Sequence, residues 1–102
     1  MFGTPGLVAL MEQAACSAVA AVLPRDQTTV GTRIDVRHLA ATPPGQEVRA
    51  LAELTHVEGR RLTFKVEAFD LAEKIGAGTH ERVVVDATRL LARARAKYSD
   101  GP

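Results

Sequence analysis

Two side chains suited to proton transfer stand out in this sequence, Glu12 and His38. Glu12 lies in an apolar, helix-forming segment, and His38 follows alternating residues that predict a strand. A Thr-Pro-Pro-Gly run at residues 42–45 comes shortly after. Burial raises the pKa of a carboxylic acid, and an imidazole titrates near neutral pH, so such a pair is suited to acid–base catalysis. If the fold brings them together, the pair predicts hydrolytic chemistry.

Length and charge restrict the elements that can position these residues. The chain has 102 residues, of which 46% are hydrophobic and 25% charged, and this composition predicts one globular domain. The formal net charge of +1 provides no broad electrostatic field for nucleic acid or an anionic membrane. Any bound anion must therefore be held by local groups.

An Ala-rich segment at residues 7–23 predicts the first helix. This helix is expected to begin at Thr4 or Gly6 and to end before Pro24. Glu12 interrupts the apolar run and no basic residue precedes the segment, which argues against a membrane span and a signal peptide. Because the segment is apolar almost all round, most of its circumference is expected to be covered.

The single cysteine, Cys16, lies among the alanines of this segment and is expected to be buried. One cysteine cannot form an internal disulfide bond, and this usage fits a reducing cytosol. We therefore expect a structural role for Cys16 and a cytoplasmic location for the protein.

Alternating apolar and polar residues predict an antiparallel sheet after the first helix. The predicted strands cover residues 32–38, 48–55, 62–68 and 74–86. Glu58 and Gly59 are expected to turn the second strand into the third as a hairpin, and residues 70–73 to make the next turn. Gly76 and Gly78 suggest a bulge or a close backbone approach in the last strand.

The order of elements is one helix, four antiparallel strands and a terminal helix, which places the chain in the α+β class. The terminal helix, at residues 87–98, is basic and expected to be mostly exposed, with Leu90, Leu91 and Ala94 on its inner side. The apolar face of the sheet needs a cover, which the first helix can supply. We expect the sheet to wrap around that helix in one domain at residues 1–98, followed by a tail at residues 99–102.

Five segments carry a more specific signal in their order and spacing. They are Leu10–Glu12, Val30–Thr32, Val36–Gly45, Val57–Leu62 and Ile75–Arg82. Together they resemble the fluoroacetyl-CoA thioesterase-like family of hotdog-fold thioesterases. The resemblance implies an antiparallel sheet wrapped around a long central helix.

The resemblance also implies an activity. It is the hydrolysis of a short-chain, fluoroacetyl-like acyl-CoA to the free acid and CoA. The implied assembly is a homodimer or higher homo-oligomer with active sites at the subunit interface. CoA is part of the substrate, so no separate cofactor is expected, nor a metal, nucleic acid or membrane partner. The alternative is a non-catalytic acyl-CoA-binding or dimerisation module.

The resemblance assigns roles to individual residues. Thr4 matches the catalytic threonine of the family, Glu12 the catalytic glutamate and His38 the catalytic histidine. Gly31 matches the position whose backbone contacts the substrate, and Arg82 matches an arginine at the ligand site. Whether Glu12 attacks the substrate directly or activates water stays open.

Each of these residues also has a structural interpretation. Thr4 would cap a helix, Glu12 would face solvent, and His38 would be an ordinary strand-end histidine. Gly31 would allow a strand bulge, and Arg82 would be a solvated strand charge. Three further candidates are interpreted as structural: Cys16, His56 and His80.

The spacing of Thr4 and Glu12 sets a geometric condition on the site. If both lie in one helix they are about 12 Å apart, at a rise of about 1.5 Å per residue, and cannot touch. Thr4 is therefore expected in a loop that folds back, in a site completed by the other subunit, or in a mixture of the two. We predict a site completed by the other subunit, or the mixture.

The N-terminus departs from the family pattern. Relatives carry a segment before the helix that supplies a first strand, so the hotdog fold is expected to be N-terminally shortened in this chain. The chain would then be a minimal variant or the product of a start codon placed too late. Loss of that strand is expected to expose a sheet edge.

Overall fold

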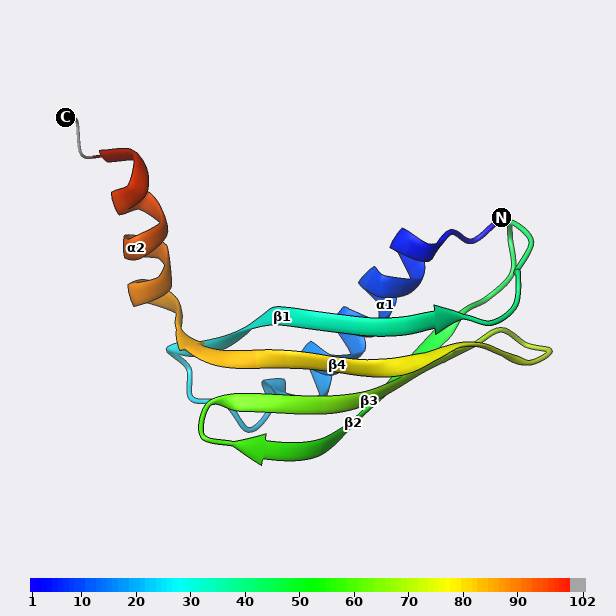
Figure 1. Cartoon of the computed structure of the whole chain (residues 1–102), viewed down its shortest axis with the longest axis horizontal. Coiled ribbons are helices and arrows are strands. Elements are labelled where there is room, and N and C mark those ends of the chain that lie inside the picture. The colour runs from blue at the N-terminus through cyan, green and yellow to red at the C-terminus, as the bar shows by residue number, and fades with distance from the viewer. Residues whose placement is uncertain (100–102) are drawn as a thin grey trace.

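The computed structural model describes residues 1–99, which form two helices and one four-stranded sheet (Figure 1). In chain order the elements are α1 (Thr4–Ala20), β1 (Gln27–His38), β2 (Arg49–Glu58), β3 (Arg61–Phe69), β4 (Lys74–Asp86) and α2 (Ala87–Ser99). This order confirms the predicted α+β class. Ser99, the first residue of the predicted tail, belongs to α2, and residues 100–102 lie outside the described residues.

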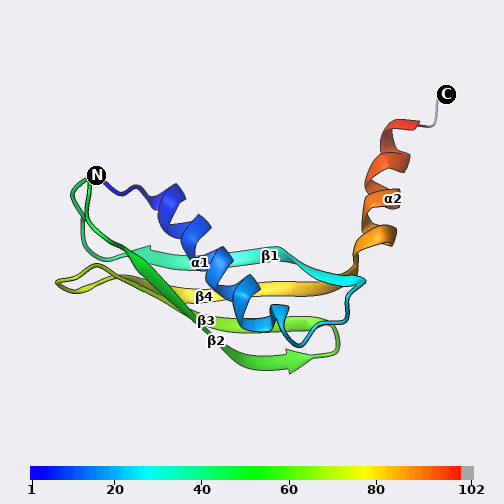
Figure 2. The same cartoon turned by 180° about the vertical axis from the view of Figure 1, so that it is seen from behind.

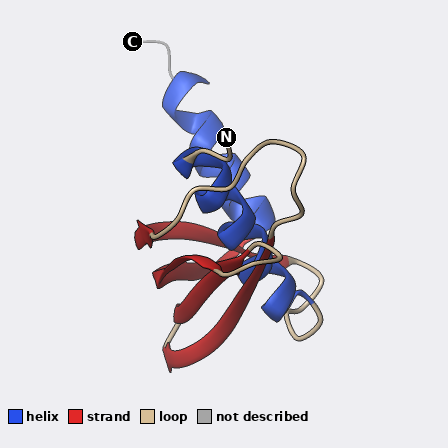
Figure 3. Cartoon of the chain, turned by 90° about the vertical axis from the view of Figure 1, so that its right-hand side faces the viewer, coloured by secondary structure: helices blue, strands red, loops and turns tan. Residues whose placement is uncertain are grey.

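The four strands form one antiparallel sheet in the order β1-β4-β3-β2. α1 runs diagonally across one face of this sheet (Figure 2), and Figure 3 shows the same arrangement from the end of the sheet. β1 and β2 are the edge strands of the described sheet. The edge strand β1 ends at His38, so one predicted site residue lies at the end of an edge strand of the described sheet.

Alternation along β3 builds the core beneath α1. Every second residue of β3 is buried: Leu62, Phe64, Val66 and Ala68. On α1 the buried residues recur every four positions: Leu7, Met11, Ala15 and Val19. This spacing aligns the four helix residues in one stripe, which belongs to the same core cluster as the β3 residues. Glu12 follows Met11 and therefore lies at the border of the buried stripe.

The expectation that α1 is covered on most of its circumference is wrong. Its buried residues form one stripe, and Cys16, expected to be buried, is exposed. The reason is geometric, because one sheet covers one side of a helix and no second layer within residues 1–99 covers the other. Small side chains such as alanine expose little apolar surface, so an Ala-rich composition does not report burial. The outer side of α1 is left open.

The terminal helix also differs from the expectation. Leu90, Leu91 and Ala94, expected on an inner side, are all exposed. The carboxylate of Asp86 caps this helix by accepting a hydrogen bond from the Arg89 N–H at 2.8 Å. From there α2 projects away from the sheet (Figure 1), so its apolar residues have no layer to pack against. Neither helix in residues 1–99 has the length and hydropathy needed to cross a membrane.

Gly76 and Gly78 lie at close approaches, as predicted for β4. A Cβ atom at Gly78 would overlap the carbonyl oxygen of Asp35 and lie 2.6 Å from Val36 Cα, both in the backbone of β1. A Cβ atom at Gly76 would lie 2.9 Å from the Cδ atoms of Leu7, at the far end of a flexible side chain. The two glycines therefore face obstacles of different stiffness.

Gly78→Ala is expected to destabilise the fold more than Gly76→Ala. The backbone of β1 cannot move aside without disturbing strand pairing, whereas Leu7 can change rotamer. For Gly76→Ala we expect a loss of roughly 1–3 kcal/mol, which is typical of overpacking, and a larger loss for Gly78→Ala. Urea unfolding followed by circular dichroism measures both. Equal losses would contradict the difference between the two obstacles.

Candidate active site

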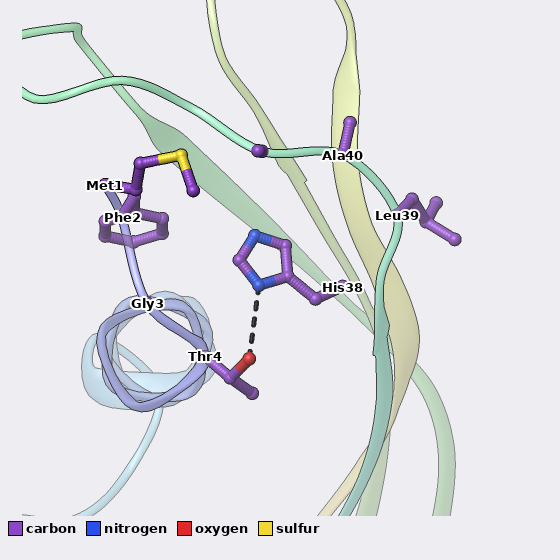
Figure 4. A pocket seen from close by; sticks show the side chains of 8 residues that line it. Met1, Phe2, Gly3, Thr4, His38, Leu39 and Ala40 are labelled. Atoms are coloured by element: carbon purple, nitrogen blue, oxygen red, sulfur yellow. Dashed lines mark hydrogen bonds between the residues drawn. The ribbon is translucent and has the colours of Figure 1, made fainter.

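Thr4 and His38 meet where α1 begins and β1 ends (Figure 4). Thr4 Oγ1 lies 3.2 Å from His38 Nδ1, within hydrogen-bond distance. The ring of Phe2 meets the imidazole edge to face, with the ring centroids 6.4 Å apart. His38 Nε2 is buried and has no hydrogen-bond partner among residues 1–99. A buried polar atom of this kind is costly, so a partner from outside the chain would stabilise it.

A cavity of about 440 Å³ lies beside this pair. Residues 1–4 and 38–41 line it (Figure 4). The Phe2 N–H donates to the carbonyl oxygen of Thr42 at 2.9 Å, and the Thr42 hydroxyl donates to Asp70 Oδ2 at 3.0 Å. Thr42 is fully buried, so the first residue of the Thr-Pro-Pro-Gly run anchors the cavity wall.

A second cluster surrounds Glu12, further along α1. Glu12 Oε2 accepts a hydrogen bond from Arg82 Nη1 at 3.1 Å. Arg82 is only 6% exposed, and its guanidinium also donates to the Thr29 hydroxyl at 2.8 Å and the Thr29 carbonyl at 2.9 Å. Because most of its N–H groups are used within the chain, Arg82 is better placed to hold Glu12 than to bind a ligand phosphate.

Glu12 is less buried than expected, with 43% of its side chain exposed. The hydrogen bond that it makes within residues 1–99 uses Oε2 and leaves Oε1 without a partner there. A groove of about 250 Å³ adjoins it, lined by Glu12, Gly31, Thr32, Arg33, Ile34 and His80. A carboxylate fixed at one oxygen and accessible at the other is suited to act as a base or a nucleophile.

Gly31 permits this arrangement because it has no side chain. A Cβ atom there would lie 2.6 Å from Glu12 Oε2, 3.1 Å from Arg82 Nη1 and 3.2 Å from His80 Cε1. The strand register also shifts between Gly31 and Arg33, so β1 bulges beside Glu12. The strand bulge that the structural interpretation of Gly31 predicts is therefore present, and it contacts the Glu12 cluster.

His80, interpreted as structural from the sequence, belongs to the Glu12 cluster. It is 2% exposed, with Nε2 at 3.2 Å from Arg82 Nη1 and Nδ1 at 2.7 Å from the Arg33 carbonyl oxygen. The available signal was the spacing of His80 and Arg82, because residues two apart on a strand share one face. His56, also interpreted as structural, lies on the surface of β2.

The predicted pair of Glu12 and His38 does not form within one chain. Thr4 and Glu12 both lie in α1, so about 12 Å of helical rise separates the residue that contacts His38 from Glu12. No hydrogen bond or ion pair links Glu12 to His38 among residues 1–99. The alternative that Thr4 lies in a loop folding back is also wrong, because Thr4 is the first residue of the helix. One chain thus carries two separate clusters.

The polar groups of both clusters are acid–base groups with protein partners. The carboxylate of Glu12 pairs with a guanidinium, and the imidazole of His38 with a hydroxyl. Within residues 1–99, no group of three or more His, Cys, Asp or Glu side chains is arranged to hold a metal ion. The chemistry available from these side chains is proton transfer and nucleophilic attack.

Comparison with known proteins connects these clusters to a family. The family model described as Fluoroacetyl-CoA-specific thioesterase matches residues 1–88. The chain belongs to this family. The fluoroacetyl-CoA thioesterase of Streptantibioticus cattleyicolor is 46% identical over 101 residues, which cover 99% of this chain and 73% of the relative. The resemblance read from the five sequence segments is therefore confirmed.

Solved structures related to this thioesterase family have the same fold. The structure of the fluoroacetyl-CoA thioesterase FlK matches with a TM-score of 0.90 and 47% identity, covering 94% of this chain and 71% of that chain. A hot-dog-like protein from Thermanaerovibrio acidaminovorans matches with a TM-score of 0.89 and 28% identity, covering 97% and 73%. These matches confirm the hotdog fold, in which α1 is the central helix.

The part of the chain shared with the thioesterase family contains both clusters. The matched residues include Thr4 and His38 as well as Glu12 and Arg82, whereas most of α2 lies beyond residue 88.

Asp70 fixes the loop that borders the Thr4–His38 cavity. The backbone N–H groups of Glu73 and Ala72 donate to Asp70 Oδ1 at 2.9 Å and 2.8 Å. These hydrogen bonds, together with that from the Thr42 hydroxyl, hold the pKa of the Asp70 carboxyl below its usual range. Asp70 thus couples the turn before β4 to the loop after β1.

The depressed pKa of Asp70 predicts a pH dependence of stability. Since the pKa is lower in the folded chain, Asp70 stabilises the fold above its unfolded pKa of about 3.9, and this contribution is lost as the pH falls through the folded pKa. We expect Asp70→Asn to lower Tm at neutral pH and to approach the wild type as the pH falls below about 4. Thermal melts across this range provide the measurement, with Asp35→Asn as a surface control. A Tm difference independent of pH would refute the role of the Asp70 carboxylate.

Proposed function

We propose that this chain is an acyl-CoA thioesterase that hydrolyses a short-chain acyl-CoA, of the fluoroacetyl type, to the free acid and CoA. Its membership of a thioesterase family supports the reaction class. The observation that carries the proposal is Glu12, a half-exposed carboxylate held at one oxygen by Arg82 beside a groove. A carboxylate in this position is suited to activate water or to attack a thioester carbonyl.

In the proposed reaction Glu12 removes a proton from water as the water oxygen bonds to the thioester carbonyl carbon. The carbon–sulfur bond then breaks, and CoA leaves as a thiolate that takes up a proton. A backbone N–H near Gly31 would bind the developing oxyanion. Direct attack by Glu12 would instead form a mixed anhydride that water hydrolyses. Mass spectrometry of the rapidly quenched enzyme distinguishes the two routes, because only direct attack leaves the acyl group covalently bound to Glu12.

We further infer that a second copy completes the site. Gly31, beside Glu12, and His38 both lie on the edge strand β1, and the outer side of α1 is open. In a homodimer the Glu12 cluster of one copy would face the Thr4–His38 pair of the other. His38 would then orient the attacking water or donate a proton, and Thr4 would position His38 through its hydroxyl.

Exposed groups support our proposals for the remaining substrate contacts and for the compartment. Because the guanidinium of Arg82 is used within the chain, we assign the CoA phosphates to exposed basic residues, Arg37 or those of α2. The free thiol of Cys16 fits a reducing compartment, and we place the enzyme in the cytoplasm.

Release of CoA from a panel of short acyl-CoA thioesters tests this proposal. The wild type is expected to release CoA from at least one thioester well above the rate in buffer, and His38→Ala is expected to be impaired. Calorimetry with the same thioesters measures binding separately. Binding without CoA release would identify a non-catalytic acyl-CoA-binding or dimerisation module instead.

A further inference from the structure

The hydrogen bonds of His80 define its protonation state. A backbone carbonyl can only accept a hydrogen bond, so the contact of 2.7 Å with the Arg33 carbonyl oxygen places a proton on Nδ1. A guanidinium can only donate, so the contact of 3.2 Å with Arg82 Nη1 requires a lone pair on Nε2. The ring at this buried position is therefore the neutral Nδ1–H tautomer.

This tautomer explains how Arg82 is oriented. Its Nε and Nη2 atoms donate to the hydroxyl and the carbonyl of Thr29, and Nη1 donates to His80 Nε2. The second hydrogen of Nη1 remains for Glu12 Oε2, at 3.1 Å. Nε2 of His80 and Oε2 of Glu12 lie 3.9 Å apart as two acceptors that share one donor nitrogen. His80 thus contacts the group that holds Glu12.

We propose that His80 is a positioning residue for hydrolysis, which acts by fixing the Arg82 guanidinium so that Glu12 is held by Oε2. The proposal rests on the assignment of Glu12 as base or nucleophile. Nothing else within residues 1–99 offers Arg82 Nη1 an acceptor besides Glu12 and His80. Without the imidazole acceptor, only the two hydrogen bonds to Thr29 would orient the guanidinium, and Nη1 could shift together with the carboxylate of Glu12.

The hydrogen bond at His80 Nδ1 suggests an alternative to the positioning role, in which His80 is purely structural. Nδ1–H is bonded to Arg33, where the register of β1 shifts. In a purely structural role, His80 would hold this bulge and fill space, and its Nε2 atom would not matter. The two roles depend on different ring nitrogens, so different substitutions can separate them.

His80→Gln and His80→Asn form the decisive pair. The glutamine carbonyl oxygen can reach the position of Nε2 and accept from Arg82, whereas the asparagine amide can reach the position of Nδ1 and donate to Arg33. If His80 positions Arg82, Asn is expected to lower kcat by about tenfold to a hundredfold, which is typical of a small misplacement of a catalytic group. Gln is expected to retain most of kcat, and KM to change little in both.

The controls test the role of His80 separately from general effects of the substitutions. His56→Gln and His56→Asn make the same substitutions at an exposed histidine and are expected to leave kcat unchanged. Loss of kcat in His80→Gln equal to or greater than that in His80→Asn would overturn the positioning role, as would unchanged kcat in both.

The tautomer can be measured without any activity assay. Long-range ¹H–¹⁵N correlation spectra of the wild type are expected to show the Nδ1–H form for His80 at neutral pH. An Nε2–H form or a doubly protonated ring would overturn the assignment. If the wild type hydrolysed no acyl-CoA, the proposed function would fail while this spectrum still reported on His80 and Arg82.

Discussion

Glu12→Gln is expected to lower kcat for acyl-CoA hydrolysis by about 10²–10⁴-fold, the range that general acid–base catalysis contributes. The amide oxygen of glutamine can still accept the hydrogen bond from Arg82 Nη1, so the side chain keeps its place. It cannot take a proton from water or attack a carbonyl. Because the substitution removes a group that acts in the transition state, KM is expected to change by less than about threefold. Steady-state kinetics of CoA release provide both values.

Two controls accompany this experiment. Glu53→Gln makes the same change of charge at an exposed position of β2 and is expected to leave kcat unaffected. Thermal melts show whether Glu12→Gln still folds, because removing a carboxylate from a buried guanidinium can lower stability. A folded Glu12→Gln variant with wild-type kcat would remove Glu12 from the mechanism.

The sheet could be predicted well from the sequence because the signals that define it are local. Alternation with a period of two marks each strand, and the predicted range of 74–86 coincides with β4. The hairpin turn needs a residue with positive φ, and Gly59 has φ of 61°. β1 begins earlier than predicted, at Gln27, since its polar first residues pair with the end of β4.

Burial of the helices could not be predicted in the same way. Composition shows that α1 is apolar, but the number of layers that cover it depends on the whole assembly. Cys16 and the apolar residues of α2 are exposed because one chain supplies one sheet. The same reason limits what the sequence predicts about the site. The sequence shows the types of the site residues, but it does not give the distance between Glu12 and His38. The place of His80 in the Glu12 cluster was not predicted, because it depends on a hydrogen bond to Arg82. The spacing of the two residues places them on one face of β4, but it does not show that they form a hydrogen bond.

A mixture of two inactive variants is expected to recover activity. Glu12→Gln and His38→Ala each remove one of the two clusters, which lie apart in a single chain. If each site takes Glu12 from one copy and His38 from the other, a heterodimer of the two variants has one site with both substitutions and one site with neither. Random exchange of subunits gives about half heterodimers, so the mixture should reach about a quarter of the wild-type rate.

A second mixture provides the matched control. Thr4 contacts His38 within one chain, so Thr4→Ala and His38→Ala affect the same half of the site. Every site in their heterodimer then keeps one substitution, and no recovery is expected. Native mass spectrometry confirms that subunits have exchanged in both mixtures. Exchange without recovery for Glu12→Gln and His38→Ala would show that the two residues do not act together across the interface, since recovery requires only that one site receive a native residue from each copy.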